Sequence, residues 1–216
     1  MNKIIAFDCD STLSGIEGVD ELARLVGPEV FQQVEDLTNL AMNGEVVVEE
    51  IFALRLDLIQ PTHQQCQEIG QQYLATIEPT AKETIAALQN DGWTCLIISG
   101  GFTPCIEPLA QELGIERIEA VPLHFNDEGN YLGFDQDYPT TRSGGKPEII
   151  AALQESLSPD VFVMVGDGAS DLETVPLVDH FIGFLRYVNR PKVAQNSPLT
   201  ATSLSEIPGL LDLCGQ

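Results

Sequence analysis

The stretch Ile4-Ile5-Ala6-Phe7-Asp8-Cys9-Asp10 decides the fold of this chain. Its four consecutive apolar residues indicate a strand that is buried on both faces, as in a parallel sheet covered by helices. Asp8 and Asp10 follow at the carboxyl end of the strand, where open α/β sheets bind their ligands. If the backbone stays extended, both carboxylates face one side, as a nucleophile and a general acid and base would need. The same pattern is also typical of a simple turn, because Asp bonds readily to its own backbone.

The buried-strand pattern recurs along the chain and alternates with helical segments. We predict further strands over 93–98, 161–165 and 179–184, and two short β runs within 118–134 around a hairpin turn at 126–129. We predict helices between and after them over 79–90, 103–113, 146–157, 190–195 and 203–213. Because strands alternate with helices, the sequence predicts an α/β fold with a doubly wound parallel sheet.

A helical segment interrupts this alternation near the start of the chain. Apolar spacing, proline and glycine stops predict helices over 17–26, 28–42, 46–59 and 62–75. We expect residues 15–76 to form a small cap domain over the sheet edge, and residues 1–14 and 77–216 to form the core domain. Arg55 lies beside the apolar stripe of the third helix, where its guanidinium either extends to water or meets an anion.

Other polar residues follow the later strands or begin helices. Ser99-Gly100-Gly101 follows the second predicted strand and could present backbone N–H groups and a helix N-terminus to an anion, or form an ordinary turn. Lys146 begins a helix behind two glycines, and it could be solvated or reach inward as a fixed cation. A second pair of acids, Asp167 and Asp171, follows the strand at 161–165.

The loops after parallel strands converge on one sheet edge, so these groups can meet although they span most of the sequence. Crowded carboxylates repel one another, and a hard divalent cation makes them compatible. Because the set offers oxygen ligands without His or Cys, it points to Mg²⁺. We expect one cation to link Asp8, Asp167 and substrate oxygens, while Lys146 and the Ser99 loop hold a phosphate.

Composition limits the partners. Against 10 Lys and Arg stand 33 Asp and Glu, for a formal net charge of −23. This charge argues against nucleic acid and anionic membranes, which need a basic surface, whereas a small anionic substrate stays possible beside local cations and a metal. Five scattered cysteines without Cys-x-x-Cys fit reduced thiols. With no apolar run near the ~20 residues of a membrane helix and no signal-like start, we expect a cytoplasmic protein, either monomer or homodimer.

The motifs, in this order, resemble the four-motif pattern of the haloacid dehalogenase superfamily of aspartyl-phosphate phosphatases. They are Asp8-Cys9-Asp10-Ser11-Thr12, Ser99-Gly100-Gly101, Lys146, and Gly166-Asp167-Gly168 with Asp171. The sequence is similar above all to the phosphoserine phosphatase family within it. That similarity runs from about residue 4 to about residue 196 through Glu17-Gly18-Val19-Asp20-Glu21-Leu22-Ala23, Ala41-Met42, Arg55-Leu56-Asp57-Leu58-Ile59-Gln60-Pro61, Ser99-Gly100-Gly101-Phe102 and Gly144-Gly145-Lys146.

The resemblance implies a role for each acid of the core. Asp8 would be the nucleophile and a Mg²⁺ ligand. Asp10 would be the general acid and base, and its backbone carbonyl would also bind the metal. Asp167 would be a further metal ligand, while Asp171 would orient the site without touching the ion.

The resemblance also implies how the substrate is held. The residues that would bind phosphate are Ser99, Gly100 and Lys146, with Ser170 nearby. In the cap, Glu17 would meet the ammonium group of phosphoserine, Arg55 its carboxylate, and Met42 would pack over the aliphatic part. Two positions depart from the family pattern: Asn43 stands where glycine is frequent, and Leu185-Arg186 replaces a pair of small residues.

The implied activity is Mg²⁺-dependent hydrolysis of O-phospho-L-serine to L-serine and phosphate through an aspartyl phosphate, as in serine biosynthesis. Two alternatives stay open. Another phosphomonoesterase of the same superfamily would act on a sugar or acid phosphate with the same motifs. A signalling receiver module also phosphorylates an aspartate after a parallel strand, but it needs neither a second acid two residues on nor a helical cap.

Overall fold

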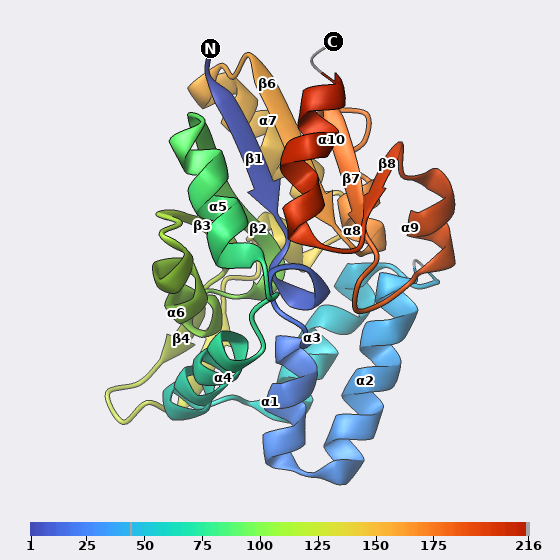
Figure 1. Ribbon diagram of the computed structural model, residues 1–216. Helices are drawn as coiled ribbons and strands as arrows, with labels where there is room; N and C mark the ends of the chain where they lie inside the picture. Colours follow the sequence, from blue (N-terminus) through green and yellow to red (C-terminus); the bar gives the residue numbers. More distant parts are fainter. Residues whose placement is uncertain (44, 215–216) are drawn as a thin grey trace.

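The computed structural model describes residues 1–43 and 45–214 of the 216-residue chain, except for the side chains of Met42 and Cys214. Within these residues a six-stranded sheet forms the centre, in the order β3-β2-β1-β6-β7-β8, and all neighbouring strands are parallel (Figure 1). The strands are β1 (Lys3–Phe7), β2 (Trp93–Phe102), β3 (Arg117–Val121), β6 (Val161–Gly166), β7 (His180–Phe184) and β8 (Leu199–Ala201). The predicted doubly wound α/β sheet is therefore confirmed.

Both faces of β1 are apolar, which is why this strand lies at the centre of the sheet. Ile5 and Phe7 join one cluster of buried side chains, whereas Ile4 and Ala6 join another on the opposite face. The first cluster includes residues of α5 (Ala81–Asn90), α6 (Thr103–Leu113) and α10 (Ile207–Cys214). The second includes residues of α7 (Gly145–Leu157), α8 (Ala169–Leu172) and α9 (Pro191–Asn196). Helices therefore cover both faces.

The register of β1 brings distant parts of the chain to one edge of the sheet. Phe7 pairs with Ile97 of β2 on one side and with Val165 of β6 on the other. Because the strands run in the same direction, the residues that follow them leave at the same edge. The chain moves from β1 to opposite sides of the sheet, so this edge is the switch point at which such sheets bind ligands.

The helical segment between β1 and β2 lies at this carboxyl edge (Figure 1). Its helices are α1 (Gly18–Val26), α2 (Pro28–Met42), α3 (Val48–Ile59) and α4 (His63–Ala75), within two residues of the predicted bounds. We call residues 15–76 the helical insertion. The chain enters and leaves it side by side, since Ser14 and Ile77 form an antiparallel bridge. In the described part of the chain, every helix falls short of the length or apolar character that a membrane crossing requires.

The end of β2 differs from the prediction. Ser99-Gly100-Gly101 was expected to follow the strand, either as an anion-binding loop or as an ordinary turn, but β2 continues through it to Phe102. The pairing of β2 with β3 shifts register between Ile98 and Phe102, so the strand is irregular where the glycines stand. Glycine inside a strand often marks such an irregularity, because it adds no side chain to the pleat.

Three other boundaries also differ. The segment 118–134 holds three strands in place of two: β3 joins the main sheet, while β4 (Leu123–Phe125) and β5 (Tyr131–Phe134) form the predicted hairpin. β8 was not predicted, because three residues are too few for a recognisable alternation. The expected closing helix at 203–213 divides into a 3₁₀ turn at Leu204–Glu206 and α10.

The contact of α4 with α6 depends on a glycine. A Cβ at Gly70 would stand 2.7 Å from Cγ of Pro108. Pro108 lies inside α6, and its rigid ring cannot move aside. Gly70→Ala should therefore lower the free energy of unfolding in urea by about 1–3 kcal/mol, as overpacking does. Gly209→Ala in α10 is the matched control, because no atom outside its chain neighbours and its own helix backbone lies within 4 Å of that Cβ position. It should be neutral or slightly stabilising. Equal stability of the two variants would contradict a close α4–α6 contact.

Candidate active site

The chain reverses direction immediately after β1. Asp8 donates its backbone N–H to the carbonyl of Val165 at 2.9 Å, and its Oδ1 accepts from the N–H of Cys9 at 2.8 Å. Asp10 itself is extended, but a helical turn over Cys9–Leu13 begins directly after Asp8 and Ser11 has a φ of 50°, so the chain does not stay extended as the shared orientation of the two carboxylates required. Asp8 therefore acts as a backbone cap, as the turn interpretation expected. In the described part of the chain no hydrogen-bond donor reaches its Oδ2, so this oxygen stays available for other chemistry.

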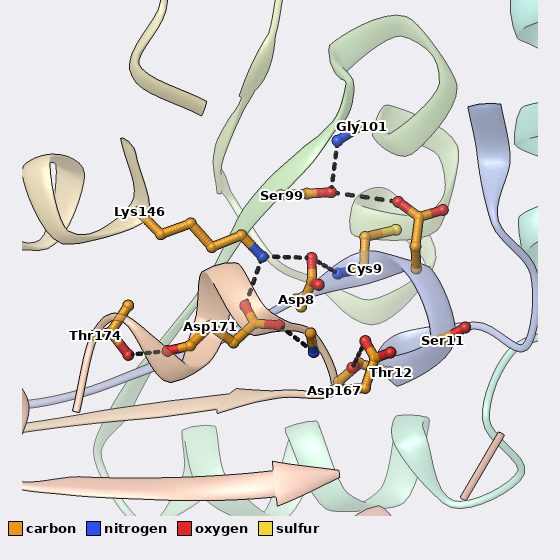
Figure 2. Close-up of polar contacts among 12 residues, drawn as sticks. Asp8, Cys9, Ser11, Thr12, Ser99, Gly101, Lys146, Asp167, Asp171 and Thr174 are labelled. Carbon is orange, nitrogen blue, oxygen red and sulfur yellow. Dashed lines mark hydrogen bonds and ion pairs between the residues drawn. The ribbon is translucent and has the colours of Figure 1, made fainter. Parts of the chain in front are cut away.

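A cluster of buried carboxylates lies at the ends of β1 and β6 (Figure 2). Oxygens of Asp8, Asp167 and Asp171 all lie within 4.8 Å of one another. Burial, together with the charge of Asp8, raises the pKa of Asp167 to about 7 and also raises the pKa of Asp171. Like charges held this close in a buried site need positive partners.

One such partner is Lys146. Its Nζ lies 2.6 Å from Asp171 Oδ1 and 3.0 Å from Asp8 Oδ1 (Figure 2). Burial opposes its charge, but Asp171 and Asp8 outweigh this effect and raise the pKa of Lys146 above its ordinary value. A Cβ at Gly145 would clash with the backbone carbonyl of Pro139, so only glycine fits before the lysine. Of the two alternatives, Lys146 is the inward fixed cation.

Asp10 has a separate set of partners. Its Oδ1 accepts from the N–H of Gly18 and from the hydroxyl of Tyr73, both at 2.6 Å, and its Oδ2 lies 3.5 Å from Ser99 Oγ. Burial, and then the charge of Asp8, raise the pKa of Asp10 to about 6. An acid with a pKa near neutrality can both release and accept a proton during a reaction.

Arg55 reaches this site from α3 of the helical insertion. Its side chain is buried and lines the same pocket as the acids. Nη1 donates to Thr38 Oγ1 at 3.3 Å, whereas Nε is buried without a partner among the residues that the structure describes. Burial lowers the pKa of Arg55, and the charge of Asp20 opposes this. The guanidinium therefore does not extend to water, and its position favours an anion from outside the chain.

Glu17 is linked to the core by an arginine that sequence reasoning missed. Glu17 accepts from Ser11 Oγ at 2.7 Å and lies 3.5 Å from Nη2 of Arg190. Arg190 is buried, and its Nε donates to Asp167 Oδ2 at 3.2 Å. Burial, with the charges of Asp10 and Asp167, raises the pKa of Glu17. One signal could have identified Arg190: it is the N-cap of α9, where the helix dipole disfavours a cation.

Sequence reasoning also missed hydroxyl groups that contact the acids. Tyr73 bonds to Asp10, and Thr12 Oγ1 donates to Asp167 Oδ1 at 3.4 Å. Tyr73 had no usable signal, because a tyrosine on an apolar helix face is usually a core residue, whereas Thr12 ends the motif that follows the first strand and could have been included with the acids. Asn43 is exposed and donates to Glu45 on the surface. The predicted contact of Met42 lies outside the described residues.

These groups surround one narrow pocket between the strand ends and the helical insertion. It has a volume of about 50 Å³, which is room for roughly three or four waters. The predicted site residues with described side chains all line it, except Ser99 and Asp171, which lie behind it. Two hydrogen bonds join α3 of the insertion to the core beside the pocket. Ser143 Oγ accepts from the N–H of Val48 at 3.3 Å, and the backbone N–H of Ser143 donates to the carboxylate of Glu49 at 2.8 Å. The arrangement can hold a small anion away from bulk water.

The acids also fit a metal ion by their chemistry. The clustered carboxylates offer oxygen ligands only: Asp8 and Asp167 directly follow the adjacent strands β1 and β6, and Asp171 belongs to α8. Oxygen donors of this kind suit hard divalent cations such as Mg²⁺. Both oxygens of Asp171 already accept from Lys146 and from the N–H of Gly168. Both oxygens of Asp167 likewise accept, from Thr12 and from Arg190, so among these three acids Asp8 keeps an oxygen without a donor in the described part of the chain.

Comparisons with known proteins agree with this geometry. The family model of haloacid dehalogenase-like hydrolases matches residues 5–175. A phosphoserine phosphatase of Drosophila melanogaster is 38% identical over 96% of this chain and 77% of the fly protein, and that of Homo sapiens is 37% identical over 96% and 92%. A solved structure described as a phospho-aspartyl intermediate analogue of phosphoserine phosphatase has a TM-score of 0.83 and 26% identity, covering 97% of this chain and 98% of its own. The chain therefore belongs to the haloacid dehalogenase-like hydrolase family, in the branch that holds the phosphoserine phosphatases.

Proposed function

We propose that this chain is a Mg²⁺-dependent phosphatase that hydrolyses O-phospho-L-serine to L-serine and phosphate through an aspartyl phosphate, in serine biosynthesis. One observation carries the proposal: a buried arginine and a glutamate of the helical insertion share a pocket with the acids and Lys146 of the core. Phosphoserine has a carboxylate, an ammonium and a phosphate, which match these three kinds of group. The names of the relatives support the same substrate.

In the proposed reaction Asp8 is the nucleophile. Its Oδ1 is held by Lys146 and the N–H of Cys9, which leaves Oδ2 to attack phosphorus. Asp10 gives its proton to the serine oxygen as the ester bond breaks. Asp10 then takes a proton from the water that splits the aspartyl phosphate, so both oxygens of Asp8 are restored. Tyr73 and Gly18 hold Asp10 in place for both transfers.

General acid catalysis supplies only part of the acceleration. It contributes about 10²- to 10⁴-fold, whereas phosphate monoesters can require up to ~10²¹-fold. The rest of the acceleration would come largely from Mg²⁺ and from binding of the phosphate. Mg²⁺ would be held by the carboxylates of Asp8 and Asp167 and the backbone carbonyl of Asp10, and it would neutralise charge on the phosphate oxygens. The phosphate oxygens would also be bound by four residues of the core: Ser99, Gly100, Lys146 and Ser170. Asp171 would not touch the substrate; it would hold Lys146 in position through their hydrogen bond.

The helical insertion would read the amino-acid part of the substrate. Arg55 would bind the carboxylate, and Glu17 would bind the ammonium. The raised pKa of Glu17 reflects burial and the charges of Asp10 and Asp167, which outweigh the opposing charge of Arg190. A bound ammonium would favour its charged form. Met42 would pack against the aliphatic part.

We also propose the organisation and setting of the protein. Residues 15–76 would be a cap domain on a core built from 1–14 and 77–216, and the protein would work in the cytoplasm as a monomer or homodimer. The four cysteines with described side chains are buried and unpaired, which supports a reducing compartment. The large acidic excess supports the expectation that neither nucleic acid nor membrane is a partner.

The proposed function is tested by phosphate release from a panel of phosphomonoesters with and without Mg²⁺. Phosphoserine should be the best substrate, with kcat/KM about 10²-fold or more above sugar phosphates, because the site would otherwise leave buried charges unpaired. Chelation of the metal should abolish release, and so should Asp8→Asn, since an amide cannot attack. Asp212→Asn on the surface is the control. Near-normal activity of Asp8→Asn, or a preference for sugar phosphates, would overturn the assignment.

Arg55→Ala tests how the substrate is recognised. The KM for phosphoserine should rise about 10²-fold, as expected when a charged hydrogen-bonding partner is lost. Hydrolysis of p-nitrophenyl phosphate, which has no carboxylate, should change little. Arg24→Ala, an exposed arginine of the same insertion, should leave both reactions unchanged. Equal losses on both substrates in Arg55→Ala would count against Arg55 as the carboxylate-binding residue.

A further inference from the structure

Three buried polar side chains are joined by a row of hydrogen bonds inside the helical insertion. Asp20 comes from α1, Thr38 from α2 and Arg55 from α3, and their exposed fractions are 8%, 1% and 5%. Thr38 Oγ1 lies 2.6 Å from Asp20 Oδ1, and Arg55 Nη1 lies 3.3 Å from Thr38 Oγ1. Only Arg55 was predicted to be a site residue.

The direction of these hydrogen bonds follows from the chemistry of the groups. A guanidinium has donors but no acceptor, so the single hydroxyl proton of Thr38 must go to Asp20. Burial raises the pKa of Asp20 to about 6, and Thr38 and Arg55 oppose the rise, so Asp20 is a carboxylate at neutral pH. The bond from Thr38 to Asp20 is therefore charge-assisted and strong. It fixes the hydroxyl with a lone pair directed at Arg55.

The hydroxyl also keeps the acid and the arginine apart. In the described part of the chain, no carboxylate forms an ion pair with Arg55, and its buried Nε has no partner. A direct pair with Asp20 would occupy the donors that Arg55 could offer to a ligand, because a guanidinium binds carboxylates through a fixed fork. With Thr38 between them, the charge of Asp20 still favours the buried guanidinium, while Nε of Arg55 keeps no partner in the described part of the chain and Arg55 lines the pocket.

We propose that Asp20 and Thr38 are positioning residues that hold Arg55 ready for the carboxylate of the substrate and thereby set selectivity for phosphorylated amino acids. This inference rests on the proposed function. It differs from a structural role, in which the same bonds would merely join α1, α2 and α3. A positioning role predicts a loss confined to substrates that carry a carboxylate.

The test compares phosphoserine with O-phosphoethanolamine, which has the same phosphate and ammonium but lacks the carboxylate. Thr38→Val keeps the shape of the side chain and removes the hydroxyl. Its KM for phosphoserine should rise roughly 10- to 100-fold, as for a lost hydrogen bond to a charged group, while kcat and the KM for phosphoethanolamine stay within about 3-fold. Thr38→Ser should restore the KM, and Thr84→Val, a buried threonine of α5, should change neither substrate.

The outcomes separate this proposal from the proposed function. If Thr38→Val does not fold by thermal melting, Thr38→Ala removes the same hydroxyl from a smaller side chain and should give the same pattern. Equal losses on both substrates, or an unchanged KM for phosphoserine, would overturn the positioning role while Arg55→Ala still loses phosphoserine selectively. If Arg55→Ala loses both substrates equally, carboxylate recognition by Arg55 fails, and the role of Thr38 fails with it.

Discussion

The structure depends on the compensation of charge at one edge of the sheet. Asp8, Asp167 and Asp171 are buried within reach of one another, and removing such carboxylates from water is unfavourable unless each has a partner. Lys146 and Arg190 supply positive charge from two different helix starts. Because both cations are themselves buried, neither set of charges is stable without the other. In the proposed enzyme, a divalent ion would complete this balance of charge.

The helical insertion adds a second set of charged side chains to those at the sheet edge. Its arginine is buried without an ion pair in the described part of the chain, whereas its glutamate is linked through Arg190 to the core. The narrow pocket limits the contact of these charges with bulk water, where they would be screened. In the proposed complex the core would bind the phosphate of the substrate, and the insertion would bind its amino-acid part.

The sequence was sufficient for the features that depend on local pattern. The apolar run at 4–7 predicted the central strand, and residue spacing predicted the helices of the insertion closely. It was insufficient where partners are distant in the chain. Arg190 meets Glu17 across 173 residues, and the hydroxyl of Tyr73 meets Asp10 only because α4 packs beside the turn after β1. The continuation of β2 through its glycines was also missed, because glycine usually indicates a turn.

The most direct measurement is the binding of Mg²⁺ to the metal-free protein by titration calorimetry, in the wild type and in Asp167→Ala. The proposed arrangement predicts one ion per wild-type chain, and a loss of binding in the variant, because Asp167 and Asp8 would share that ion. A variant that binds Mg²⁺ as tightly as the wild type, or a wild type that binds none, would contradict the claim that these acids gather around one cation.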